Sequence, residues 1–182
     1  MNDFTSVPFD KVSIILAVHV PAHAGDPIHK NRPSHGFAYH RDGLTTYTFD
    51  NGNSLTIPPN TIIYLPKSSN YTVTRDTNSG VVVGTYAINF NTSNDITLSE
   101  FKFSPKNPEK IFHYFQETEV AWRTKSVGYY EKCCRNFYDI ILNIKLDMTA
   151  KYMPNNSDYL LRIIIKAGNK LGHFLFRNIL CS

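Results

Sequence analysis

The sequence has few cysteines, and their spacing builds no cross-linked framework. Its 182 residues hold three, of which Cys133 and Cys134 are adjacent and Cys181 lies next to the end. An odd number with an adjacent pair predicts neither a disulfide scaffold nor a CxxC metal site. Reduced thiols are typical of a cytoplasmic protein, so we expect the chain in the cytoplasm.

Long apolar runs and concentrated charge are lacking as well. The apolar run at residues 14–18 is far shorter than the roughly 20 residues that a membrane-spanning helix needs. The basic residues are scattered along the chain, and the net charge is only +4. We therefore expect no membrane partner, and no direct contact between this chain and nucleic acid.

The common catalytic motifs are absent from the sequence. It contains no Gly-x-Ser-x-Gly elbow, no phosphate-binding loop and no Gly-x-Gly-x-x-Gly segment. No pair of carboxylates lies among the predicted strands, where the two could act as acid and base. From these absences the sequence predicts that the protein is not an enzyme.

The first half of the chain contains short strands of alternating polarity, separated by turn residues. Residues 45–49 and 54–57 flank an Asn-Gly turn, which is the strongest short-range signal of a β-hairpin. Asn60 follows two prolines and tolerates the left-handed turn that would lead into a strand at 61–65. Gly84 indicates a bulge or a close approach inside its strand. The remaining strands are predicted at residues 11–20, 35–41, 71–75 and 81–90.

The second half changes to a helical pattern. Pro108 is placed to open a helix at about residues 108–124, and a second helix is predicted at about residues 126–152. Its apolar residues recur at spacings typical of a heptad seam, namely Tyr130, Cys134, Phe137, Ile141, Ile144 and Met148.

We expect this seam to pair with a second copy of the chain in a two-fold dimer, because a monomer seldom leaves such a stripe exposed. Two alternatives remain open: the seam packs on the chain's own barrel, or the apolar tail covers it. The predicted organisation is a barrel over residues 1–105, a helical dimerisation region over 106–155 and a short helical tail over 156–182.

The order of these elements resembles the cupin-like sensor domain of AraC-type bacterial transcription regulators, over about residues 10–155. The segments that carry the resemblance are residues 32–37 (RPSHGF), the turn at Gly43, residues 47–49, residues 62–69 (IIYLPKSS), residues 88–90 and Trp122. The resemblance implies a mainly β protein with C-terminal helices. Its cupin-like double-stranded β-helix barrel would bind a small effector, often a sugar, and its antiparallel helical region would pair subunits.

The resemblance also points to ligand-binding residues. In the arabinose-responsive member an arginine before a strand holds the sugar, and Arg32 is similarly placed, with a shorter spacing to its strand. A guanidinium fork suits a sugar or a sugar acid, and tyrosine adds an apolar face with a hydrogen-bonding tip. The predicted ligand-binding residues are Arg32, His35, Tyr39, Tyr47, Tyr71 and Thr85.

A metal site is the competing reading of the histidines. Metalloenzyme cupins hold a metal with a His-x-His pair, a Glu and a later His. Here His35 and His40 are five apart and would point to opposite faces of one strand. Residues 1–52 contain no Glu, and Tyr71 stands where the later His would be. The sequence therefore predicts no metal and no cofactor.

The family's DNA-binding half carries two helix-turn-helix units, for which residues 155–182 are too few. We therefore expect a sensor fragment or a truncated regulator, which would contact DNA only through a missing C-terminal domain. The alternative is a stand-alone cupin, either a metal-dependent sugar-modifying enzyme or a sugar-binding protein.

Overall fold

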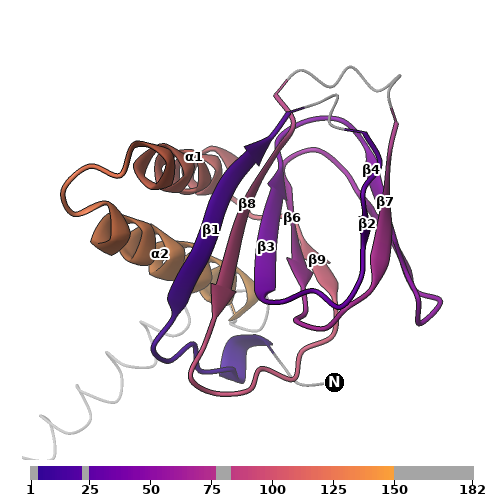
Figure 1. The fold of residues 1–182 in the computed structure, drawn as a ribbon, viewed down its shortest axis with the longest axis horizontal. Helices are drawn as coiled ribbons and strands as arrows, with labels where there is room; N and C mark the ends of the chain where they lie inside the picture. Colours follow the sequence, from indigo (N-terminus) through magenta and orange to yellow (C-terminus); the bar gives the residue numbers. More distant parts are fainter. Residues whose placement is uncertain (1–3, 22–24, 77–82, 150–182) are drawn as a thin grey trace, which may run out of the picture. The chain divides into compact units, whose positions relative to one another are not determined.

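The computed structural model describes residues 4–21, 25–76 and 83–149. Residues 1–147 form one compact unit of antiparallel strands followed by two helices, as Figure 1 shows. This confirms the predicted fold class, a cupin-like β-barrel followed by helices. The predicted helical tail at residues 156–182, with Cys181, lies outside the described residues.

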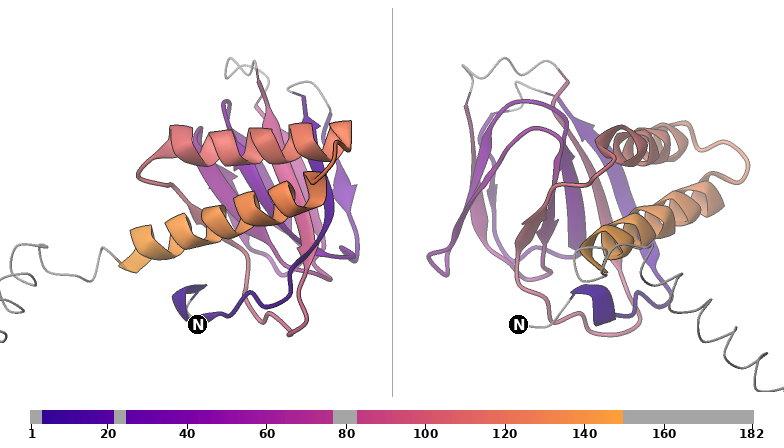
Figure 2. Two further views of the ribbon diagram at one scale, coloured as in Figure 1. Left: turned by 90° about the vertical axis from the view of Figure 1, so that its left-hand side faces the viewer. Right: turned by 180° about the vertical axis from the view of Figure 1, so that it is seen from behind.

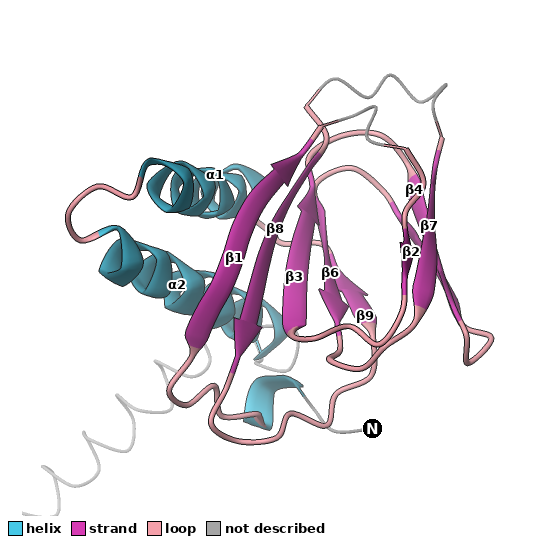
Figure 3. Ribbon diagram, viewed as in Figure 1, coloured by secondary structure: helices cyan, strands magenta, loops and turns pink. Residues whose placement is uncertain are grey.

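Two antiparallel sheets face each other across the interior of the barrel (Figure 3). The larger sheet has the order β1 (Ser13–Val20), β8 (Thr85–Asn91), β3 (His35–His40), β6 (Thr61–Leu65) and β9 (Phe101–Phe103). The smaller sheet has the order β2 (Ile28–His29), β7 (Tyr71–Arg75), β4 (Thr45–Phe49) and β5 (Ser54–Ile57). A short 3₁₀ helix, Phe4–Ser6, precedes β1.

The two-residue period of β3 decides what each of its side chains can reach. His40 contacts Tyr47 on the opposite sheet, whereas Phe37 and Tyr39 pack against aromatic rings of the helices. Even-numbered residues of β3 thus face the barrel interior, and odd-numbered residues face the helical layer. His35 and His40 lie on opposite faces, as their spacing predicts.

The turns adopt the backbone conformations that their residues favour. Asn60 has φ +57° and Gly52 has φ +87°, both in the left-handed region that Asn and Gly tolerate best. Gly84 lies just before β8 with φ +91°, and its backbone N–H donates to the carboxylate of Asp42 at 2.8 Å. The irregular register occurs in β1, near Ile14, and the described pairing of β8 with β3 has none, so the predicted bulge at Gly84 is not found among these strand pairs.

The helices α1 (Pro108–Thr124) and α2 (Tyr129–Thr149) lie side by side on the outer face of the larger sheet (Figure 2). Pro108 opens α1 as predicted, and the side chain of Asn107 caps the helix by accepting the backbone N–H of Lys110 at 3.2 Å. Lys125 ends α1 in the left-handed conformation, with φ 52°.

The heptad seam of α2 packs against the chain's own barrel. Phe137 and Ile144 are fully buried within the single chain, and the Phe137 ring lies 4.6 Å from the ring of Phe90. Tyr130 accepts a hydrogen bond from the backbone N–H of Ile14 at 3.2 Å. The expectation that the seam pairs with a second copy is therefore wrong for Phe137 and Ile144, because the larger sheet already covers these side chains.

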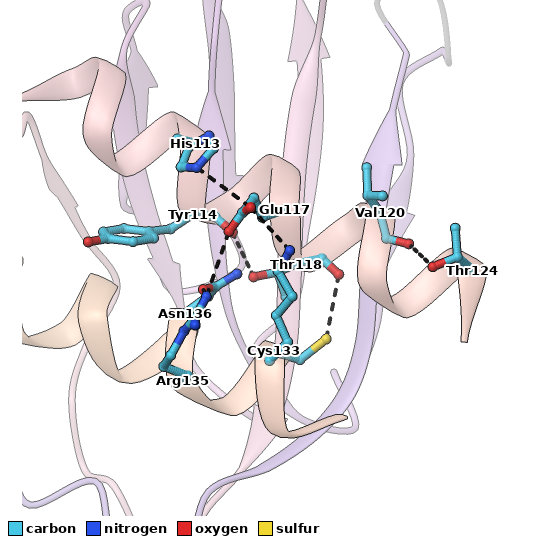
Figure 4. Close-up of polar contacts among 10 residues, drawn as sticks. His113, Tyr114, Glu117, Thr118, Val120, Thr124, Cys133, Arg135 and Asn136 are labelled. Atoms are coloured by element: carbon cyan, nitrogen blue, oxygen red, sulfur yellow. Dashed lines mark hydrogen bonds and ion pairs between the residues drawn. The ribbon is translucent and has the colours of Figure 1, made fainter. Parts of the chain in front are cut away.

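Polar contacts between the helices centre on Glu117 of α1 (Figure 4). Its carboxylate accepts a hydrogen bond from Lys132 at 3.1 Å and lies 3.9 Å from Arg135. The thiol of Cys133, also on α2, donates to the carbonyl of Thr118 at 3.6 Å. Because the charged groups are partly exposed, each pair contributes little stability; together they favour one alignment of the two helices.

Candidate functional site

A cavity of about 210 Å³ lies between the two sheets, inside the barrel. Its walls are largely aliphatic, and they include Leu16, Val18, Ala38, Leu65, Val73 and Ala87. Its polar lining residues are His29, Arg32, Tyr47, Tyr71, Arg75, Thr85 and Asn89. The arrangement combines an apolar body with a few convergent polar groups, which is typical of a small-molecule site.

Arg32 is the buried charged residue at the centre of one polar part of the lining, with 8% of its surface exposed. Its guanidinium donates to the hydroxyl of Tyr71 at 2.6 Å and to the side-chain oxygen of Asn89. Its backbone carbonyl accepts the N–H of Ser68 at 2.8 Å. These contacts fix the segment before β3, so the guanidinium is held in place before any ligand arrives.

Gly36 is the residue that lets Arg32 lie so close to β3. A Cβ at this position would collide with the guanidinium of Arg32 and would lie 3.0 Å from the side-chain oxygen of Asn89. The strand therefore needs glycine at this point because of the side chain that crosses it.

His29 lies beside this polar group, its ring stacked on that of Tyr71 with centroids 4.7 Å apart. Burial lowers the pKa of His29, and the positive charges of Arg32 and Arg75 lower it further. The imidazole is therefore uncharged at neutral pH. Burial raises the pKa of Tyr71, although Arg32 opposes this shift, so the phenol keeps its proton.

A second polar group consists of His40, Tyr47 and Thr85. The His40 ring hydrogen-bonds to the hydroxyl of Tyr47 at 3.0 Å through Nε2 and to that of Thr85 at 3.2 Å through Nδ1. Burial, with a smaller contribution from Arg75, lowers the pKa of His40 to about 3. Burial also raises the pKa of Tyr47. The group is therefore uncharged, with one ring nitrogen donating and the other accepting.

Four of the six predicted ligand-binding residues line this cavity: Arg32, Tyr47, Tyr71 and Thr85. The structure brings them together, and their binding of a ligand stays a prediction. The other two, His35 and Tyr39, do not line it. His35 accepts the backbone N–H of Lys67 at 3.2 Å, and Tyr39 donates to Asn60 at 2.9 Å. Both are odd-numbered residues of β3 and face away from the interior.

The prediction missed three polar lining residues, namely His29, Arg75 and Asn89. The two-residue period could have found two of them, since Arg75 shares a face of β7 with Tyr71 and Asn89 shares a face of β8 with Thr85. His29 belongs to a two-residue strand and has no such signal.

In the described ranges, no group of three or more His, Cys, Asp or Glu side chains is arranged to hold a metal ion. Nor does any helix of the same ranges combine the length and the apolar character that crossing a membrane takes.

Comparison with known proteins adds structural neighbours but no family. No protein-family model matches the sequence, and no curated protein matches it. ToxT from Vibrio cholerae, a regulator of the AraC family, was solved with a bound unsaturated fatty acid. It aligns with a TM-score of 0.43 and 9% identity over 74% of this chain and 55% of its own. The chain thus spans about half the length of ToxT.

Two cupin-fold neighbours are more distant. The DUF861 family protein of Thermotoga maritima has a TM-score of 0.27 and 15% identity over 45% of this chain and 78% of its own. Oxalate decarboxylase from Bacillus subtilis has a TM-score of 0.29 and 14% identity over 62% of this chain and 34% of its own.

The prediction that the protein is not an enzyme requires correction. Oxalate decarboxylase is an enzyme, and it is among the solved structures that align with this chain. Its low identity leaves the activity of this chain open. The missing catalytic motifs therefore do not settle whether the chain is an enzyme.

Proposed function

We propose that this barrel and its two helices are the small-molecule-sensing module of an AraC-type transcription regulator. The observation that carries the proposal is the cavity inside the barrel, where Arg32 is buried and held by Tyr71 and Asn89. The resemblance in residues 32–37 and 62–69 supports the same assignment. The resemblance predicts a sugar or a sugar acid as the effector, and the proposed function itself requires only a small molecule that Arg32 can hold.

Strand β8 connects the cavity to the helices. Thr85 and Asn89 line the cavity on one face of this strand. On its other face, the ring of Tyr86 lies 5.4 Å from that of Phe112 on α1, and Phe90 packs on α2. In the proposal, a ligand that moves β8 also moves the surface on which both helices rest.

The proposal keeps dimerisation but moves it to another face of α2. Tyr138, Leu142 and Leu146 are 42%, 52% and 57% exposed, and their spacing places them on one side of the helix. A second copy covering this stripe would remove it from water. Sedimentation of Leu142→Asp tests this: a dimer that becomes a monomer supports it, and an unchanged mass removes the stripe from the interface.

The regulatory role is tested with the tagged gene product in its own cells. The proposal assigns DNA contact to a domain other than this barrel-and-helix unit, and it places the protein in the cytoplasm. Sequencing of the co-precipitated DNA is expected to show promoter regions, with an occupancy that changes when Arg32 is replaced by Gln. Ligand binding without any enriched DNA would contradict the regulatory role and would favour a stand-alone binding protein.

A further inference from the structure

The chemistry of the cavity lining narrows the class of ligand. One part of the lining is aliphatic, with Val18, Ala38 and Ala87 as examples, and it offers no hydrogen-bonding side chain. The hydrogen-bonding side chains form two groups, and in one of them the hydroxyls of Tyr47 and Thr85 are already bonded to His40. The group around Arg32, with Tyr71 and Asn89, keeps an unpaired donor for a ligand. A neutral sugar needs partners around its whole ring, because unpaired polar groups in an apolar site are costly. The lining is better suited to a molecule with one polar end.

The charge at that polar end is positive and uncompensated. Arg32 donates to Tyr71 and Asn89, which are both uncharged acceptors. Its Nε is buried without a hydrogen-bond partner, and it makes no ion pair with any residue that the structure describes. A buried cation without a counter-charge is strongly unfavourable. An anionic ligand would supply both the missing charge and an acceptor.

A second cation lines the same cavity. Arg75 lies on β7, and its guanidinium donates to the uncharged carbonyl of Gly25. The charges of Arg32 and Arg75 both act on the intervening His29, where each disfavours protonation. No Asp or Glu is among the lining residues that the structure describes. The potential inside the cavity is therefore positive, and it favours anions.

We propose that the cavity binds a small organic carboxylate with an apolar body, its carboxylate held by Arg32 and its body against the aliphatic wall. This rests on the proposed small-molecule function and names its ligand class. A cavity of roughly 150 Å³ accommodates benzene, so one of about 210 Å³ has room for a short chain or a single ring with a carboxylate. Inorganic phosphate would leave the aliphatic wall unfilled.

The test is a calorimetric titration of the purified chain at low salt. The ligands are hexanoate, its uncharged analogue 1-hexanol, inorganic phosphate, and arabinose with galacturonate as the sugar and the sugar acid. We expect hexanoate to bind at least tenfold more tightly than any of the others. Arg32→Gln should lower the affinity for hexanoate at least tenfold. The matched surface variant Arg123→Gln should keep the affinity within twofold of that of the unaltered chain.

A second variant, in the aliphatic part of the lining, guards against misfolding of the Arg32 variant. Ala87→Leu adds volume to the aliphatic part and leaves Arg32 untouched, so it should weaken hexanoate at least tenfold with the melting temperature retained. Unchanged affinity in this variant would place the ligand elsewhere and overturn the proposal.

The outcomes separate the ligand class from the function. Binding of arabinose or 1-hexanol that equals or exceeds hexanoate binding overturns the carboxylate and leaves a small-molecule sensor standing. If phosphate binds as tightly as hexanoate, the cavity recognises negative charge without an apolar body. That result also overturns the proposal. If neither these ligands nor a broad metabolite panel binds the folded chain, both the carboxylate proposal and the proposed sensor function are overturned.

Discussion

Replacing Phe137 by Ala tests whether α2 belongs to the core of a single chain. The side chain is fully buried, and its ring lies 4.6 Å from that of Phe90, 6.1 Å from that of Phe37 and 6.3 Å from that of Phe9. Removing a phenyl ring from such a cluster costs about 3–5 kcal/mol, since the apolar contacts are lost and a cavity remains. We expect the free energy of unfolding to fall by this amount.

Urea denaturation followed by circular dichroism measures the effect at two protein concentrations that differ tenfold. Leu142→Ala is the matched control, because Leu142 lies on the same helix but is 52% exposed, and exposed positions usually change stability by about 0.5 kcal/mol or less. A loss below about 1 kcal/mol for Phe137→Ala would refute the packing described above. A loss that appears only at the higher concentration would show that a second copy, and not the barrel, covers the ring.

Three further predictions follow from individual contacts. The pKa of His40 is lowered to about 3 in the folded chain, so the unfolded chain takes up a proton near pH 6.5 and the folded chain does not; stability should fall as the pH drops below 6.5, by at most about 1.4 kcal/mol per pH unit. Thermal melts of His40→Asn between pH 5 and 6.5 should show a shallower slope, and an unchanged slope would contradict the assignment. Gly36→Ala should displace the guanidinium of Arg32, and a crystal structure of this variant with Arg32 still against the strand would refute the steric argument. Asn107→Ala should lower the free energy of unfolding by about 0.5–2 kcal/mol through loss of the cap on α1, and a urea midpoint equal to that of the unaltered chain would argue against the cap.

The strands that the sequence predicts are those with strong local signals. The Asn-Gly hairpin and the turn at Asn60 fix β4, β5 and β6 within a few residues of chain. By contrast, β2 and β9 are two and three residues long, and they exist because β7 and β6 offer them partners. Pairing between segments distant in sequence leaves little local pattern, so both were missed.

The site shows the same division between local pattern and tertiary context. Alternation predicts which residues of β3 share a face, but it does not say which face points into the barrel, so it could not show that His35 and Tyr39 lie outside the cavity lining. The spacing of Phe137 and Ile144 predicts burial without naming the covering surface. The face of β3 that points inward and the surface that covers the helix both depend on how the sheets and helices pack. The strand and helix periods do not encode this packing.

The most direct test of the central claim is a crystal structure of the chain grown with hexanoate. The account predicts density for the ligand inside the barrel, with its carboxylate within hydrogen-bonding distance of Arg32 and its chain against Val18 and Ala87. A ligand bound elsewhere on the protein, or a barrel that stays empty at saturating hexanoate, would contradict it.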